Sequence, residues 1–328
     1  MVTFILRRLV YMVITLFVIS ILSFLLITLP PGSALDAEIS KLRAQGSNLS
    51  QQQVDDLIKQ YGVNDPIYTQ YIKWSKGLIH GDFGESFTYH QPVRDLIGSR
   101  IVFSIILTLG ATIFAWVVAI PIGVYSATHR YNLPDYAITV VQFVGVAIPE
   151  FLLALLVLVF AAFALGFDVG GLFSPRYQDA PWSSAKLVDF LKHVWVPILV
   201  IAASSTAWLT RVMRANLLDV LNQQYVTTAR AKGVKESRVI WKHATRNAIN
   251  PLIMALGTSL PALISGEAIV GIVLNLPTTG PLFITALQNQ DMYLAVTLLM
   301  FMSLLLIVGN LLADLLLAWV DPRVRNVT

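Results

Sequence analysis

The densest group of ionisable side chains in this chain is the segment YVTTARAKGVKESRVIWKHATRNAINP, from Tyr225 to Pro251. Arginine, lysine and histidine recur through it, and strongly apolar sequence lies on either side. Such basic side chains attract anionic lipid headgroups, and they also orient one protein on another. The segment is therefore expected to be a binding surface, either for the membrane or for a partner protein.

The chain lacks the residues that most metal-dependent or ATP-hydrolysing chemistry requires. It contains no cysteine, and its five histidines are scattered without the spacing of metal ligands. No G-x-x-x-x-G-K-[ST] sequence, the loop that holds the phosphates of ATP, occurs in it. The sequence predicts no metal site, no bound cofactor and no catalytic residues, so the chain is not expected to be an enzyme.

Two carboxylates lie inside apolar sequence. Glu150 follows Pro149 near the middle of one apolar stretch, and Glu267 lies toward the end of another. A charge at that depth of a membrane is costly, so each should face a water-filled cavity or a partner group. Both are candidates for the lining of a translocation pathway. The alternative for Glu150 is a structural carboxyl group that is hydrogen-bonded to a neighbouring helix.

The elements that position these groups are expected to be membrane helices. Of the 328 residues, 56% are hydrophobic and 13% are charged, and the mean hydropathy is +0.69. A span needs about 20 apolar residues and must be helical, because lipid offers no partner to backbone amides. We expect an all-α integral membrane protein with six transmembrane helices. The spans are 9–29, 101–125, 137–167, 194–209, 251–274 and 294–320.

The distribution of lysine and arginine sets the orientation. Arg7 and Arg8 precede the first span, eight basic residues lie between the fourth and fifth spans, and residues 275–293 contain none. Basic loops stay in the cytoplasm, so both termini of this multi-pass membrane protein are expected there. The predicted regions are an N-terminal transmembrane helix (1–29), a polar external region (30–100), a core transmembrane domain (101–320) with a cytoplasmic loop (210–250), and a cytoplasmic tail (321–328).

Periodicity within the basic segment predicts two short helices. Apolar residues recur every three or four positions, first at Leu218, Leu221, Tyr225 and Ala229, then at Ile240, Ala244 and Ala248. Gly233 lies between the two sets, and glycine accepts the positive φ of a sharp turn. The segment is thus expected to form an elbow of two helices. Residues alone leave open whether it lies on headgroups or docks on a protein.

Several motifs resemble the permease subunits of binding-protein-dependent ABC importers, and more narrowly the dipeptide/oligopeptide/nickel branch. The longest is RVMRANLLDVLNQQYVTTARAKGVKESRVIWKHATRNAINP, from Arg211 to Pro251. The others are ILRRL at the start, GDFGESF from Gly81, IPEF from Ile148 and DPRVR from Asp321. Together they extend over nearly the whole chain, in the order that the family has.

The resemblance implies a type I ABC importer-like fold and ATP-driven uptake by alternating access. In that family the cytoplasmic loop contains a coupling helix, which docks on a separate ATP-binding subunit. The residues here that match it are Tyr225, Ala229, Arg230, Ala231, Lys232, Gly233 and His243. The implied partners are a second, related permease chain, two ATPase subunits that bind the ATP, an external solute-binding protein and membrane lipid, but no nucleic acid.

The substrate expected from the resemblance is a dipeptide or oligopeptide. However, Gly271 occupies a position near which related peptide permeases have an acid, and LNLPTTGPLF departs from their glycine-rich pattern. Oligosaccharides or other solutes therefore stay open within the same importer class. A different class, the stand-alone ion-driven carrier, would show inverted repeats or broken helices. The sequence has no visible repeat, and Pro149 is its one hint of a break.

Overall fold

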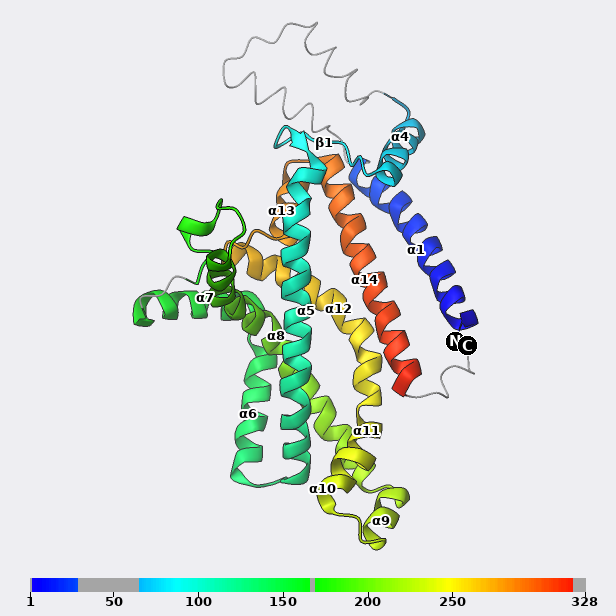
Figure 1. Ribbon diagram of the computed structural model, residues 1–328, viewed down its shortest axis with the longest axis vertical. Helices are drawn as coiled ribbons and strands as arrows, with labels where there is room; N and C mark the ends of the chain where they lie inside the picture. The colour runs from blue at the N-terminus through cyan, green and yellow to red at the C-terminus, as the bar shows by residue number, and fades with distance from the viewer. Residues whose placement is uncertain (1, 29–64, 166–168, 321–328) are drawn as a thin grey trace, which may run out of the picture. The chain divides into compact units, whose positions relative to one another are not determined.

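The computed structural model describes residues 2–28, 65–165 and 169–320 (Figure 1). These residues are mostly helical, as predicted, and they fall into two compact units. One unit contains Ser104–Pro277 and Val308–Thr328, and the other contains Val2–Phe103 and Thr278–Ile307. Much of the predicted external region and the predicted tail lie outside the described residues.

The unit of Val2–Phe103 and Thr278–Ile307 is built around apolar helix contacts. It contains α1 (Val2–Thr28), α4 (Ile67–His80), α13 (Thr279–Gln288), and the first parts of α5 (Val93–Thr128) and α14 (Met292–Val320). Its core includes Ile97 of α5, Leu282 of α13 and Leu298 of α14, all at most 2% exposed. Large apolar side chains of α1 point outward, as expected for a helix surrounded by lipid.

The GDFGESF segment is anchored in this unit by a carboxylate. It forms a short antiparallel ladder, β1 (Glu85–Ser86) with β2 (Gln91–Pro92), in which Ser86 lies opposite Gln91. The Ser86 hydroxyl donates to Asp291 Oδ2 over 2.5 Å, and the Thr88 N–H donates to the same oxygen over 3.0 Å. Asp291 is fully buried, and its Oδ1 accepts the Leu294 N–H in the first turn of α14. The segment is therefore braced against the start of α14, and its Gly84 carbonyl also accepts the Val93 N–H at the start of α5.

The other unit packs long helices closely at small residues. It contains the second part of α5, α6 (Leu133–Ala147), α7 (Glu150–Phe160), α8 (Ser184–Leu221) and α12 (Asn250–Val273). A Cβ on Gly123 of α5 would lie 2.7 Å from Met213 of α8, and one on Gly145 of α6 would lie 3.0 Å from Ala207. Small residues let the helices approach closely, which is how helices associate in lipid.

The six-span prediction is confirmed in part. Among the described residues, four helices are long and apolar enough to cross a membrane, and a bent pair of helices makes up to five. The four are Leu6–Leu26, Val93–Thr128, Ser184–Leu221 and Met292–Ala318. The predicted fifth span is the continuous helix α12, whose described apolar part, Ile264–Val273, is shorter than a span.

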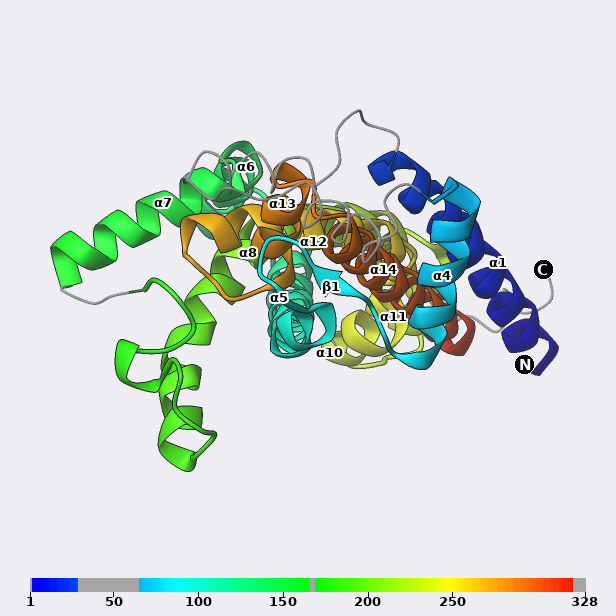
Figure 2. The same cartoon turned by 90° about the horizontal axis from the view of Figure 1, so that it is seen from above.

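The single helix predicted over 137–167 is wrong. Helix α6 ends at Ala147, α7 begins at Glu150, and the two are bent by 105° (Figure 2). Pro149 causes the break, because proline has no N–H and forces the residue before it away from helical angles. Ile148 accordingly has φ −81° and ψ 121°. The chain continues beyond α7 as one π-helical turn, Ala161–Leu165.

The predicted fourth span, 194–209, is too short. Helix α8 has 38 residues, and Ser183 caps its start by accepting the Lys186 N–H. The sequence pattern missed the first turns because they contain Lys186, Asp189 and His193. These three are nevertheless buried at 9% exposure or less, and Lys186 donates to the backbone carbonyl of Ala180 over 2.5 Å. At its other end α8 continues to Leu221, so the loop predicted at 210–250 begins as a helix.

Candidate functional site

The predicted elbow exists as a chain of short helices between α8 and α12. After the break at Asn222–Gln223 come α9 (Gln224–Ala231), α10 (Glu236–Arg238), a π-helical turn (Val239–Ala244) and α11 (Thr245–Ala248). We call residues 222–249 the elbow. Within its unit, α9 lies beyond the ends of α5 and α6 (Figure 1). A long helix flanks the elbow on each side in the sequence, α8 before it and α12 after it.

Gly233 makes the turn between the two halves of the elbow, as predicted. Its φ is +72°, and its N–H donates to the Arg230 carbonyl over 2.9 Å. The Val234 N–H returns to the Ala229 carbonyl, so the end of α9 is capped. A Cβ added at Gly233 would meet no described atom within 4 Å. Within this chain, the requirement for glycine is therefore the backbone angle and not lack of space.

The elbow residues predicted from the family motif divide into exposed and half-buried groups. Exposed are Tyr225, Arg230, Ala231 and Lys232, whereas Ala229 and His243 are half-buried. The Tyr225 hydroxyl accepts a hydrogen bond of 2.7 Å from the Asn247 side chain, which ties α9 to α11. The exposed helix α9 is thus joined to α11 by this hydrogen bond.

Arg230 has a partner within the elbow. Its guanidinium donates to Glu236 Oε1 over 2.8 Å, which connects α9 to α10 across the Gly233 turn. This hydrogen bond is the largest cause that holds the pKa of Glu236 below its usual range. Both side chains are well exposed, so the pair adds little stability and mainly orients the turn.

The single helix face predicted to join Leu218 and Leu221 to Tyr225 and Ala229 is wrong in part, because these residues lie on two separate helices, α8 and α9. Val226 is the fully buried residue of α9, while Tyr225 is 41% exposed. The 3.6-residue period does not continue from Leu218 into α9, because the helix breaks at Asn222–Gln223. In the second half, Ala244 and Ala248 are buried, and Ile240 is half-buried.

Glu150 lies where three helices meet. It is in the first turn of α7, half-buried, and its Oε1 accepts a 2.5 Å hydrogen bond from the Ser204 hydroxyl of α8. On its other side is Gly266 of α12, where an added Cβ would lie 1.9 Å from Glu150 Oε2. The absence of a side chain at Gly266 is what admits the carboxylate. Sequence reasoning did not identify either partner.

Glu267, the second candidate carboxylate, directly follows the glycine that Glu150 contacts. It is 1% exposed. Successive residues of a helix point about 100° apart, so the Glu267 side chain lies on a different face of α12 from the one at which Gly266 contacts Glu150. Glu150 therefore contacts α12 at Gly266, the residue that precedes Glu267 in the sequence. A role in a pathway stays a prediction for both.

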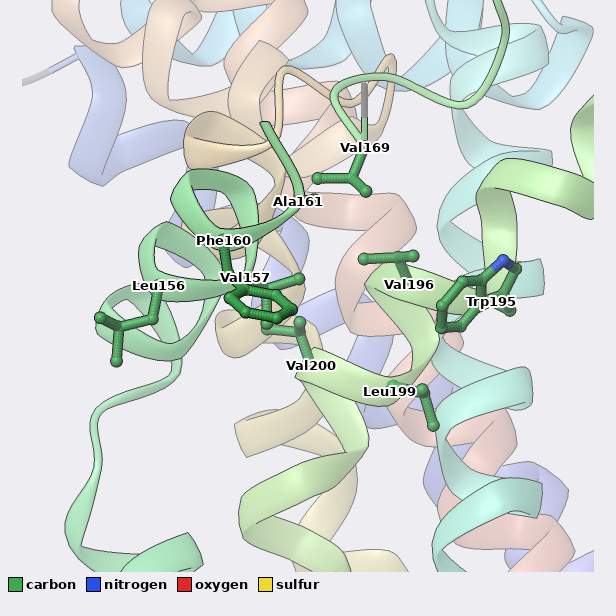
Figure 3. A pocket seen from close by; sticks show the side chains of 9 residues that line it. All are labelled: Leu156, Val157, Phe160, Ala161, Val169, Trp195, Val196, Leu199 and Val200. Carbon is green, nitrogen blue, oxygen red and sulfur yellow. The ribbon is translucent and has the colours of Figure 1, made fainter. Parts of the chain in front are cut away.

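An apolar groove runs between α7 and α8, in the same seam as Glu150 and Ser204. It has a volume of about 440 Å³, with Val157 and Phe160 on one wall and Val196 and Val200 on the other (Figure 3). Val157 lies two helical turns beyond Glu150, and Val200 one turn before Ser204. Trp195 also lines the groove, and its indole N–H donates to the Lys192 carbonyl. The groove therefore offers only apolar contact, one to two helical turns along the seam from the Glu150–Ser204 hydrogen bond.

Comparison with known proteins agrees with the resemblance noted from the motifs. Residues 119–326 match the binding-protein-dependent transport system inner membrane component, and residues 1–108 match the N-terminal region of such membrane components. The oligopeptide transport system permease protein AppB of Bacillus subtilis is 37% identical over 99% of this chain and 100% of its own. The OppB proteins of Haemophilus influenzae and Escherichia coli, oligopeptide transport system permeases, are each 32% identical over the same shares. The chain belongs to the family of binding-protein-dependent transport system inner membrane components, the permeases of ABC importers.

Proposed function

We propose that this chain is a pathway-forming permease subunit of an ATP-driven importer of dipeptides or oligopeptides. The relatives that match it end to end are named oligopeptide permeases, and this supports peptides as the substrate class. The departures at Gly271 and in LNLPTTGPLF keep oligosaccharides or another solute as the second candidate within the same importer class.

The observation that carries the coupling role is the elbow. An exposed helix, α9, ends at the Gly233 turn, where an added Cβ would meet no described atom within 4 Å, as expected for a surface that another subunit covers. The chain has no phosphate-binding loop, so ATP is bound and hydrolysed by two separate ATPase subunits. A second permease chain and an external solute-binding protein complete the importer.

The proposed orientation follows from the basic residues. The elbow and both termini are in the cytoplasm, and residues 30–100 are external. A solute released by the binding protein enters from outside, and ATP-driven closure of the ATPase pair moves the elbow from inside.

The two helices that leave the elbow provide a mechanical route to Glu150. Ser204 is on α8, which leads into the elbow, and Gly266 is on α12, which leads out of it. A displacement of the elbow therefore moves the two helices that hold the Glu150 carboxylate. Opening of this three-helix junction would expose a hydrogen-bonding carboxylate to the pathway, next to the apolar groove.

A stand-alone ion-driven carrier is the rival class. The break between α6 and α7 is a feature such carriers share. It does not decide between the classes, because broken helices also suit an importer that opens and closes. The family match and the elbow favour the importer.

The decisive experiment replaces Gly233 by valine. At φ +72° a β-branched residue is strained, so the turn should distort and α9 should lose its docking geometry. Insertion should be normal, because burial of the spans in lipid does not involve this loop. The chain, its ATPases and its binding protein would be reconstituted in vesicles, and peptide uptake and ATP hydrolysis measured together. Uptake should fall to background, and less ATPase should co-purify.

Gly81 offers a matched control. It has φ +78°, caps α4 and likewise would place a Cβ in open space. Gly81→Val imposes the same kind of backbone strain in the other unit, on the proposed external side, so ATPase binding and uptake should persist. Full ATP-driven uptake by the Gly233→Val variant would overturn the coupling role. Uptake driven by an ion gradient without ATPases would overturn the importer class.

A further inference from the structure

A buried carboxylate joins three helices at the elbow end of the unit. Asp135 is in the first turn of α6 and is 2% exposed. Arg214 of α8 donates to it twice, from Nε to Oδ1 over 3.1 Å and from an Nη to Oδ2 over 2.9 Å. The Ser126 hydroxyl of α5 donates to Oδ1, and the Tyr131 N–H donates to Oδ2 over 3.0 Å. Each carboxylate oxygen thus has two donors.

This cluster fastens the turn between α5 and α6 to the inner end of α8. Ser126 comes from the last turns of α5 and Tyr131 from the connecting turn, and Arg214 lies about two helical turns before α8 ends. The fork of an arginine on a carboxylate fixes orientation as well as distance. Gly123 of α5 also packs on Met213, so both helices of the α5–α6 hairpin contact α8 near its elbow end.

Two openings lie between the same hairpin and the elbow. A cleft of about 400 Å³ lies between Thr128–Arg130 of the hairpin and Arg230 and Glu236 of the elbow. A second opening, of about 600 Å³, lies between Tyr125 of the hairpin and Trp241 of the elbow. A displacement of the elbow is therefore carried to the hairpin mainly through α8.

We propose that Asp135 and Arg214 are positioning residues of the coupling step. They make α5 and α6 turn with α8 when the elbow moves, and α6 then displaces α7, and with it Glu150, across the Ile148–Pro149 break. The proposal rests on the function proposed above, and it adds the pair through which the movement spreads from the elbow to the rest of the unit.

A merely structural pair would affect folding but not the ratio of uptake to ATP hydrolysis. Removal of one partner would also leave a buried charge alone, which is strongly destabilising in itself. The double variant Asp135→Asn with Arg214→Gln avoids this problem, because it keeps similar volumes and leaves no unpaired charge. Arg214→Lys keeps a cation beside Asp135 but loses the two-pronged geometry.

The test uses the reconstituted importer and two labels. The chain has no cysteine, so Arg130→Cys in the hairpin and Asp219→Cys in α8, both exposed, can be spin-labelled uniquely. With native Asp135 and Arg214, the distribution of distances between the labels should be narrow, and it should be the same with and without ATP. In the double variant it should broaden. Uptake per ATP hydrolysed should fall about tenfold, equivalent to ~1.4 kcal/mol of coupling, with ATPase co-purification unchanged. Arg214→Lys should give an intermediate fall.

Two results would overturn the proposal. One is a double variant with a narrow distance and wild-type uptake per ATP. The other, if the double variant fails to insert, is an Arg214→Lys chain that couples as well as the wild type. An unlabelled wild-type importer that fails to take up peptide with ATP would instead overturn the proposed function. In that case, the distance between the labels without nucleotide still tests whether Asp135 and Arg214 hold the hairpin on α8.

Discussion

Replacement of Gly266 by alanine should test how Glu150 is held. A Cβ there would lie 1.9 Å from Glu150 Oε2, about 1.5 Å inside the 3.4 Å at which ordinary contact begins. The carboxylate is the far end of a flexible side chain, so it can rotate away while the helices stay in place. The rotation would break its hydrogen bond with Ser204, because the 2.5 Å geometry depends on the present position.

The expected free-energy change has two parts of opposite sign. Loss of a hydrogen bond to a charged group costs about 1.5–3 kcal/mol. Alanine in place of glycine inside a helix stabilises by ~1 kcal/mol. Gly266→Ala should therefore lower the free energy of unfolding by about 0.5–2 kcal/mol in the natural chain. In a Glu150→Ala background the clash disappears, and the same change should stabilise by up to ~1 kcal/mol.

The assay is a double-mutant cycle on the purified protein, with thermal or denaturant unfolding in detergent and peptide uptake in vesicles. The sign of the Gly266→Ala effect should differ between the two backgrounds, and the coupling between the sites should be about 1.5–3 kcal/mol. A cost of equal size in both backgrounds would contradict this prediction. It would mean that the alanine clashes with something other than the carboxylate.

Two further predictions concern other parts of the chain. Asp291→Ala should lower the free energy of unfolding by about 1–3 kcal/mol, because the Ser86 hydroxyl and the Thr88 N–H lose a buried acceptor; Ser86→Ala should cost less, and equal costs would contradict this view. Glu236→Gln should cost less than ~1 kcal/mol, because its pair with Arg230 is exposed. The lowered pKa of Glu236 means that this contribution is present above its usual value of 4.5 and is lost as the pH falls below it. The difference in unfolding temperature between wild type and Glu236→Gln should therefore vanish only in acid, and its disappearance near neutral pH would contradict the pairing.

The features that sequence predicted well depend on local conformational preference. Gly233 could be identified as the elbow turn because the αL region strongly favours glycine. Pro149 could be identified as a hint of a helix break because it lacks an N–H. The sequence pattern nevertheless predicted a single span where the chain bends by 105°. The size of that bend depends on where α7 can pack, which no local signal contains.

The partners of the buried polar groups were decided by the tertiary structure. Glu150 and Ser204 are 54 positions apart, and Ser86 and Asp291 are 205 apart. Composition marked Glu150 as costly in a membrane, but only helix packing could select Ser204 and Gly266 as its surroundings. Asp135 had no unusual signal at all, since an acid in the first turn of a helix is common.

Sequence alone is enough to identify this chain as a helical membrane protein of the importer permease family with a basic elbow. Apolar length, charge distribution and motif order are properties of the chain alone, and they suffice for that conclusion. The tertiary structure decided which side of the elbow is buried, how far α8 extends, and which three helices hold Glu150. Those outcomes depend on contacts between distant segments, whose free energies are set by shape and by the pairing of buried polar groups rather than by any local pattern.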